Sequence, residues 1–206
     1  MTKRVGPGIP VPDTRNPFGG KGLAVTLALL LHPRRAQSIA ELAENAQTSR
    51  PLASMVVREL RRLRLVDGEV SQGRAGTLRP KPELLYEAAP HWPTPVAAVM
   101  GGTPSLVDLP IGGGPAARSW LPSVWDPPPR AYVRSTDAVY ELLSDTGGHL
   151  IAGGAADWEI AVVDYPFAPG VVPRVVVALE LGATPRGREM LTRHLADVTL
   201  GWAVDR

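Results

Sequence analysis

Three arginines and three small residues lie between positions 49 and 61. If this segment is a helix, their spacing places them in its first turn and along one side, where they could contact the same ligand. They are Ser49, Arg50, Ser54, Val57, Arg58 and Arg61. Arginine can donate two parallel hydrogen bonds to guanine or clamp a phosphate, and a small apolar group can contact the methyl group of thymine. The set therefore indicates a surface that reads base pairs in the major groove of duplex DNA.

A helix that starts near residue 49 must hold these side chains. Ser49 is suited to cap its first turn, where Pro51 is tolerated because those amides have no partner within the helix. Apolar residues recur at helical spacing on the other side, and they are Leu52, Met55, Val56, Leu60 and Leu63. This periodicity predicts that the apolar stripe packs inward and that the arginines point outward.

The preceding residues predict two further helices. Ser38 and Glu41 have the spacing of a capping box, in which each side chain bonds the backbone amide of the other residue. Residues 45–49 then form the turn before the arginine-bearing helix. Residues 21–31 are almost entirely apolar and predict a buried helix that ends before Pro33. That run is far shorter than the roughly 20 residues needed to cross a bilayer.

A short hairpin is expected after the basic helix. Residues 69–71 and 77–79 can pair as strands, and residues 72–76 form a glycine-containing tip that carries Arg74. Pro80 and Pro82 end the hairpin, since proline cannot donate to a strand ladder. Arg74 is expected to contact a phosphate or the minor groove.

The run RPLASMVVRELRRLRLVDGEVSQGRAGTL resembles the recognition helix and wing of bacterial winged helix-turn-helix transcriptional regulators. The resemblance covers about residues 21–80. It implies that residues 21–90 form a winged helix-turn-helix DNA-binding domain. Residues 1–20 are rich in proline and glycine, and this composition predicts a flexible arm before the domain. A winged helix used only for protein contacts is the alternative.

Charge and composition differ between the two halves of the chain. Residues 1–90 carry a net charge of +6 and residues 91–206 a net charge of −4, which places a nucleic-acid footprint in the N-terminal half. Most aromatic residues lie in the acidic half. A protein that binds single strands needs aromatic side chains beside its basic groove, so this distribution favours duplex DNA.

The chain has no cysteine, and its start lacks the apolar core of a signal peptide, so a cytoplasmic protein is expected. The abundance of arginine, alanine, glycine and proline suggests a bacterial genome rich in G and C.

The remainder of the chain predicts a second domain over residues 96–206, after a proline-rich linker. Strands are expected at 96–100, 149–152 and 158–163, with a helix capped by Ser135 and another started by Thr184 and Pro185. Residues 171–181 form the longest β-branched run and predict the central strand. The expected fold class is therefore α+β, with an N-terminal winged helix-turn-helix followed by a small mixed α/β domain for regulation or interaction.

Two segments of this second half, GGHLIAGGAADWEIAVVDYPFAP and VVVALELGATPRGREML, resemble the C-terminal domain of type IV antitoxin regulators of the AbiEi-like kind. That resemblance implies a repressor with a protein partner that contacts the C-terminal domain.

A pair of carboxylates offers the one competing chemistry. Asp157 and Glu159 follow Gly153 and Gly154, as the magnesium-binding pair of nucleotidyltransferases follows a glycine turn. Only two residues separate the glycines from Asp157, where that family has a helical stretch, and residues 91–206 contain no lysine to hold phosphate. The four histidines show no ligand spacing. We therefore expect no catalytic residue, cofactor or metal.

The sequence thus predicts a sequence-specific regulator that binds double-stranded DNA, acts as a repressor and is not an enzyme. A replication or partition factor with the same DNA-binding module is one alternative, and a nucleotidyltransferase-like enzyme with an accessory winged helix is another. The expected partners are duplex DNA, a second copy of the chain and a protein bound through the C-terminal domain, with no membrane.

Overall fold

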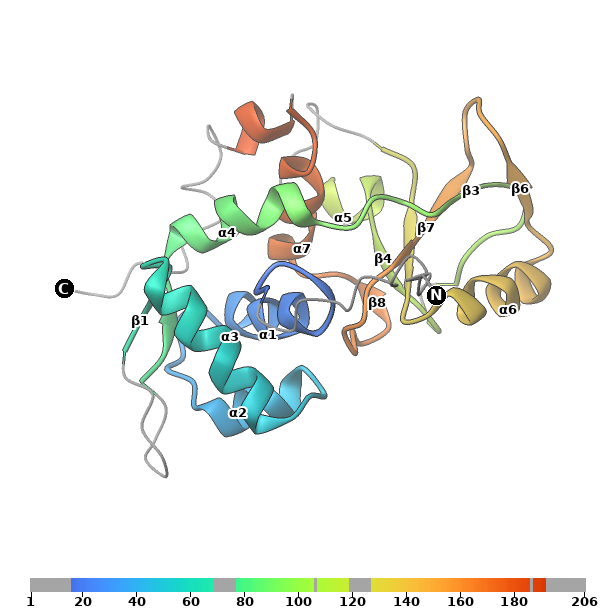
Figure 1. Cartoon of the computed structure of the whole chain (residues 1–206). Coiled ribbons are helices and arrows are strands. Elements are labelled where there is room, and N and C mark those ends of the chain that lie inside the picture. Colours follow the sequence, from blue (N-terminus) through green and yellow to red (C-terminus); the bar gives the residue numbers. More distant parts are fainter. Residues whose placement is uncertain (1–15, 69–76, 106, 119–126, 186, 192–206) are drawn as a thin grey trace, which may run out of the picture.

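The computed structural model describes residues 16–68, 77–105, 107–118, 127–185 and 187–191 of the chain, a mixed α+β protein (Figure 1). Its N-terminal elements are α1 (Gly20–Leu31), α2 (Ile39–Asn45), α3 (Arg50–Arg62), β1 (Val66–Asp67), β2 (Arg79–Pro80), α4 (Pro82–Ala88) and the 3₁₀ helix η1 (Ala89–His91). Then follow β3 (Ala97–Met100), β4 (Pro110–Gly112), α5 (Gly114–Ala117), β5 (Arg130–Val133), α6 (Thr136–Thr146), β6 (His149–Ile151), β7 (Trp158–Val162), β8 (Gly170–Val171) and α7 (Arg174–Gly182). No helix among these residues is long and apolar enough to cross a membrane.

Local signals in the sequence place the starts of α2, α3 and α6. The Ser38 hydroxyl accepts a hydrogen bond from the Glu41 amide, and the Glu41 carboxylate accepts one from the Ser38 amide, so the predicted capping box is confirmed. Ser49 and Ser135 likewise accept hydrogen bonds from amides in the first turns of α3 and α6. These contacts satisfy amides that have no partner within the helix.

The hairpin that follows α3 pairs closer to the helix than expected. Val66 lies opposite Pro80 and Asp67 opposite Arg79, while Leu78 forms a further bridge with Gln37. The predicted strand at 69–71 and the tip with Arg74 lie outside the described residues. The base of the hairpin is thereby attached both to the end of α3 and to the segment before α2.

A six-stranded mixed sheet with the order β6-β3-β7-β5-β4-β8 forms the second part of the molecule. β5 runs parallel to β7 and β4 parallel to β8, whereas the other neighbours are antiparallel. α6 packs on one face, where Val139 and Leu142 contact Val99, Trp158 and Ile160 in a core of their own. α7 and α5 lie on the other face, between the sheet and the N-terminal helices (Figure 1).

The largest hydrophobic core crosses the boundary that the sequence predicts between residues 90 and 96. It joins buried residues of α1, α3 and α4 to α7 and to Tyr132 and Ala161 of the sheet. Lys21 of α1 also donates a hydrogen bond of 2.8 Å to Asp164, just after β7. The two predicted domains therefore share one continuous core.

The predicted central strand at 171–181 is wrong. Residues Gly170–Val171 form the short edge strand β8, and the β-branched run continues as helix α7, which starts after Pro173. Eight of the nine residues of α7 are buried, so it is apolar on nearly every side and lacks the polar stripe that marks a surface helix. Periodicity alone cannot distinguish such a helix from a buried strand. The centre of the sheet is instead occupied by β7 and β5.

Candidate nucleic-acid interface

Helix α3 is held between two neighbours that decide which of its sides is exposed. Its buried residues are Ala53, Val56, Val57 and Leu60, and the helix contacts both α1 and α2. Ala43 of α2 is also buried, as expected for a small residue where two helices approach closely. These four buried residues are spaced i, i+3, i+4 and i+7, so they form a single stripe along α3.

This packing corrects the predicted outward side of α3. Val57, expected on the DNA-reading side, is fully buried, and Ser54 is half-buried. Met55 and Leu63, expected in the core, are 37% and 39% exposed. The buried side of α3 is therefore displaced from the predicted stripe towards Ala53 and Val57, which lie in the same core as residues of α1 and α2. Met55 was missed as a surface residue, since its apolar side chain fitted the assumed stripe.

The predicted arginines do reach the surface. Arg50, Arg58 and Arg61, which we call the basic face of α3, are all exposed and form no ion pair with any residue that the structure describes. Arg62, one residue further on, differs from them. Its guanidinium donates hydrogen bonds of 2.6 and 2.9 Å to the two carboxylate oxygens of Glu59, and these bonds lower the pKa of Glu59. The basic face thus consists of charges that are solvated and available.

A hollow of about 400 Å³ lies between the C-terminal half of α3 and the base of the hairpin. Five cationic residues line it, and they are Arg58, Arg61, Arg62, Arg64 and Lys81. Asp67 is the acidic residue in the lining, and its carboxylate is 3.2 Å from the ammonium group of Lys81. Such an excess of cations suits an anion such as phosphate. Arg64 and Lys81 were not predicted. Arg64 enters the lining through a left-handed backbone (φ 60°) just after α3.

The acidic pair of the second half is engaged by other groups. The Asp157 carboxylate accepts a 2.7 Å hydrogen bond from the amide of Gly101. Glu159 accepts hydrogen bonds of 2.7 and 3.0 Å from Arg130 on the neighbouring strand. Both carboxylates therefore stabilise connections within the sheet.

Arg130 connects Glu159 to a buried charge network, which the sequence analysis did not predict. The Glu180 carboxylate of α7 accepts hydrogen bonds from the hydroxyl of Tyr132 and from the amide of Gly113 (3.0 Å), and it lies 3.8 Å from Arg130. Burial raises the pKa of Glu180, although Arg130 and these hydrogen bonds oppose the shift. Because every member has a partner, the network fixes α7 to the sheet.

Two glycines make this network possible. A side chain at Gly112 would come within 2.3 Å of the Glu180 carboxylate, and one at Gly113 within 2.2 Å of the carbonyl oxygen of Pro128. Gly113 also has a φ of +69°, which other residues rarely adopt. The two glycines therefore allow the backbone to lie close to the buried Glu180 carboxylate.

Comparisons with known proteins identify no protein similar to this chain. No family model matches the chain, and neither the curated proteins nor the solved structures contain a significant match.

Proposed function

We propose that this protein is a transcriptional regulator that binds double-stranded DNA in a sequence-specific manner and acts as a repressor. In this proposal residues 21–90 form a winged helix-turn-helix and α3 is the recognition helix. The observation that carries the proposal is the basic face of α3, three exposed arginines on one helix without ion-pair partners in the described part of the chain.

The surroundings of α3 support this role. α2 precedes it across a tight turn, in which Gln47 adopts a positive φ of 46°, and the hairpin base follows it directly (Figure 1). In this proposal the cationic hollow between α3 and the hairpin base would hold backbone phosphates while the helix enters the groove. Phosphate contacts would set the register, and contacts to base edges would supply the specificity.

The displacement of the buried side of α3 changes which side chains are proposed to read bases. Val57 is no longer a candidate, because it is fully buried. Met55 takes its place as the apolar side chain that can contact a thymine methyl, beside Arg58. Ser49 caps the helix and Arg50 follows it, so both lie at the end that would approach the groove first.

Repression and assembly are further parts of the proposal. As a homodimer, the protein would present two copies of α3 to half-sites about 34 Å apart, one turn of the DNA helix. The C-terminal part would provide the second-copy contact or bind a protein partner. A reporter gene controlled by the bound site should be repressed by the wild type and released by Arg58→Ala.

The salt dependence of DNA binding tests the central proposal. If several arginines meet phosphates, the logarithm of affinity for duplex DNA should fall with the logarithm of salt concentration by roughly 0.9 per contact. Replacing Arg50, Arg58 and Arg61 together by alanine should reduce this slope. Arg174→Ala, a change of an exposed arginine at the start of α7, is the matched control and should leave the slope unchanged. A slope near zero for the wild type would refute the proposal.

Asp157 and Glu159 have no catalytic role in this proposal. The double change Asp157→Ala and Glu159→Ala should leave the affinity of folded protein for DNA unchanged. Nucleotide transfer by the wild type that disappears in the double variant would instead favour an enzyme.

A further inference from the structure

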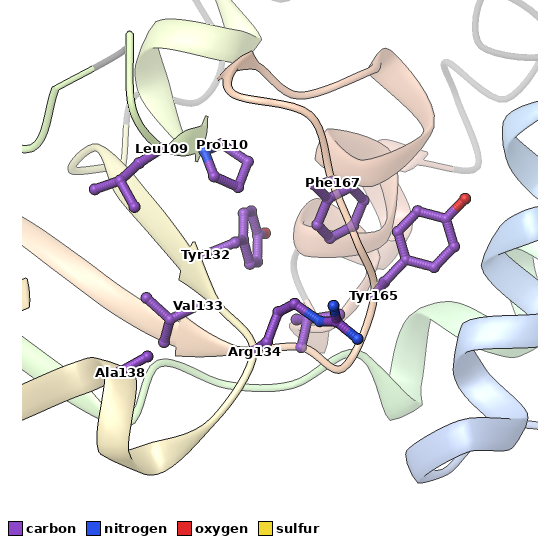
Figure 2. A pocket seen from close by; sticks show the side chains of 9 residues that line it. Leu109, Pro110, Tyr132, Val133, Arg134, Ala138, Tyr165 and Phe167 are labelled. Carbon is purple, nitrogen blue, oxygen red and sulfur yellow. The ribbon is translucent and has the colours of Figure 1, made fainter. Parts of the chain in front are cut away.

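An apolar cavity of about 320 Å³ opens at one end of the sheet, away from α3. Figure 2 shows Leu109, Val133 and Ala138 on one side of it and Phe167 on the other, with the ring of Tyr132 between them. The Tyr132 hydroxyl is bound to Glu180, so the ring contributes an apolar surface to the cavity. The volume lies at the lower end of the range for small-molecule sites, about 300–1,000 Å³.

The cavity lies at a position in the sheet where proteins with parallel strands commonly bind ligands. β5 and β7 are parallel neighbours, and the cavity is lined by residues at and beyond their carboxyl ends. The chain leaves β5 for α6 on one face of the sheet, and it leaves β7 for β8 and then α7 on the opposite face. A crevice forms where neighbouring parallel strands send their connections to opposite faces, and open α/β sheets bind ligands there.

The polar group that meets this apolar lining is Arg134. It is the charged residue among those that line the cavity in the described part of the chain. In Figure 2 its side chain extends towards the side of the cavity that carries Tyr165 and Phe167. Its side chain is 47% exposed and is held by a long contact of 3.4 Å to Asp164. Asp164 itself makes a closer ion pair of 2.7 Å with Lys21 of α1. Arg134 is therefore loosely held and can exchange Asp164 for another carboxylate.

We propose that this cavity binds a small aromatic carboxylate, with the ring among the apolar side chains and the carboxylate on Arg134. The ring would pack against Tyr132 and Phe167, as aromatic pairs do at separations of about 4.5–7 Å. The carboxylate would receive charge-assisted hydrogen bonds from the guanidinium in competition with Asp164. This site does not depend on DNA binding, and a failure of one proposal would leave the other standing.

Titration calorimetry with three probes tests the chemical class. Benzoate should bind the full-length protein, whereas neutral benzamide and ringless acetate should each bind about tenfold more weakly or worse. Equal affinity for benzoate and benzamide would overturn the role of the carboxylate. Equal affinity for benzoate and acetate would overturn the role of the cavity, and no binding of benzoate would overturn the proposal as a whole.

Three variants locate the site, and two of them act in opposite directions. Arg134→Gln should weaken benzoate binding about tenfold and leave benzamide binding unchanged. Asp164→Asn should strengthen benzoate binding, because it removes the competing carboxylate. Ala138→Leu, which fills the cavity from the first turn of α6, should abolish binding of both. Arg174→Gln is the control and should change neither affinity. Wild-type affinity for benzoate in Arg134→Gln or in Ala138→Leu would place the ligand elsewhere and refute the proposed site.

Discussion

The arginines of α3 and the arginine of β5 lie in opposite environments. Arg58 and Arg61 are exposed and have no ion-pair partner among the described residues, whereas Arg130 is buried between the carboxylates of Glu159 and Glu180. A buried charge is tolerated only when it is paired, because its desolvation costs several kcal/mol. A solvated charge carries no such requirement and remains available to a ligand. The difference teaches that the same residue type stabilises the fold in one region, whereas in the other it stays free of ion-pair partners within the described part of the chain and, in the proposed function, contacts DNA.

The largest effect is expected from breaking the buried network. Arg130→Met should lower the free energy of unfolding by about 3–5 kcal/mol, because it leaves two carboxylates without their cation. Urea denaturation followed by tryptophan fluorescence would measure the change. Arg58→Met, the exposed counterpart, should alter stability by no more than about 0.5 kcal/mol. Similar losses for the two variants would mean that the two environments do not differ as described.

The next effect concerns recognition by the exposed arginines. Arg58→Ala should weaken binding to the cognate site by about 1–3 kcal/mol more than binding to random duplex, because a bidentate contact to guanine is lost. Arg74→Ala, expected to lose a phosphate contact, should weaken both duplexes by similar factors. Paired binding curves at one fixed salt concentration would measure both. The reverse outcome would mean that the hairpin, not α3, reads the sequence.

The displacement of the buried side of α3 can be tested with two apolar residues of the same helix. Val57→Ala should lower the free energy of unfolding by about 2 kcal/mol, through lost burial and the cavity left behind. Met55→Ala should change stability by at most about 0.5 kcal/mol, yet it should weaken binding to the cognate site. Thermal or urea unfolding, together with a DNA titration, would show both. A greater loss of stability for Met55→Ala would restore the apolar stripe expected from the sequence.

The smallest effect is a pH dependence that originates at Glu180. Burial raises its pKa above the ordinary value of 4.5, so the folded chain holds this proton more tightly than the unfolded chain. The stability gained from the bound proton is complete below the unfolded pKa and is lost as the pH rises through the folded pKa. The wild type should therefore lose stability relative to Glu180→Gln over that window. Unfolding curves of both proteins at a series of pH values would measure the difference. A wild type that gains stability relative to the variant as the pH rises would show that ion pairing outweighs burial.

The starts of α2, α3 and α6 followed from the sequence. The capping box of Ser38 and Glu41 and the caps at Ser49 and Ser135 are contacts between residues three positions apart. Such contacts satisfy backbone amides of the first turn wherever the helix later packs. The exposure of the α3 arginines also followed from the sequence, but for another reason: charged side chains without partners remain in water.

The tertiary structure alone decided which side of α3 is buried and whether the run after Pro173 is strand or helix. Val57 is buried in the core that α3 shares with α1 and α2, and the spacing of residues within α3 specifies neither neighbour. α7 is helical and buried on nearly every side because the sheet and the N-terminal helices surround it, and its apolar sequence has no period that would report this. The buried pairing of Glu180 with Tyr132 and Arg130 joins residues about 50 positions apart. Capping hydrogen bonds join residues within one helical turn, so they can be predicted from neighbouring positions in the sequence. Burial depends on which distant segments pack together, and only the tertiary structure determines that.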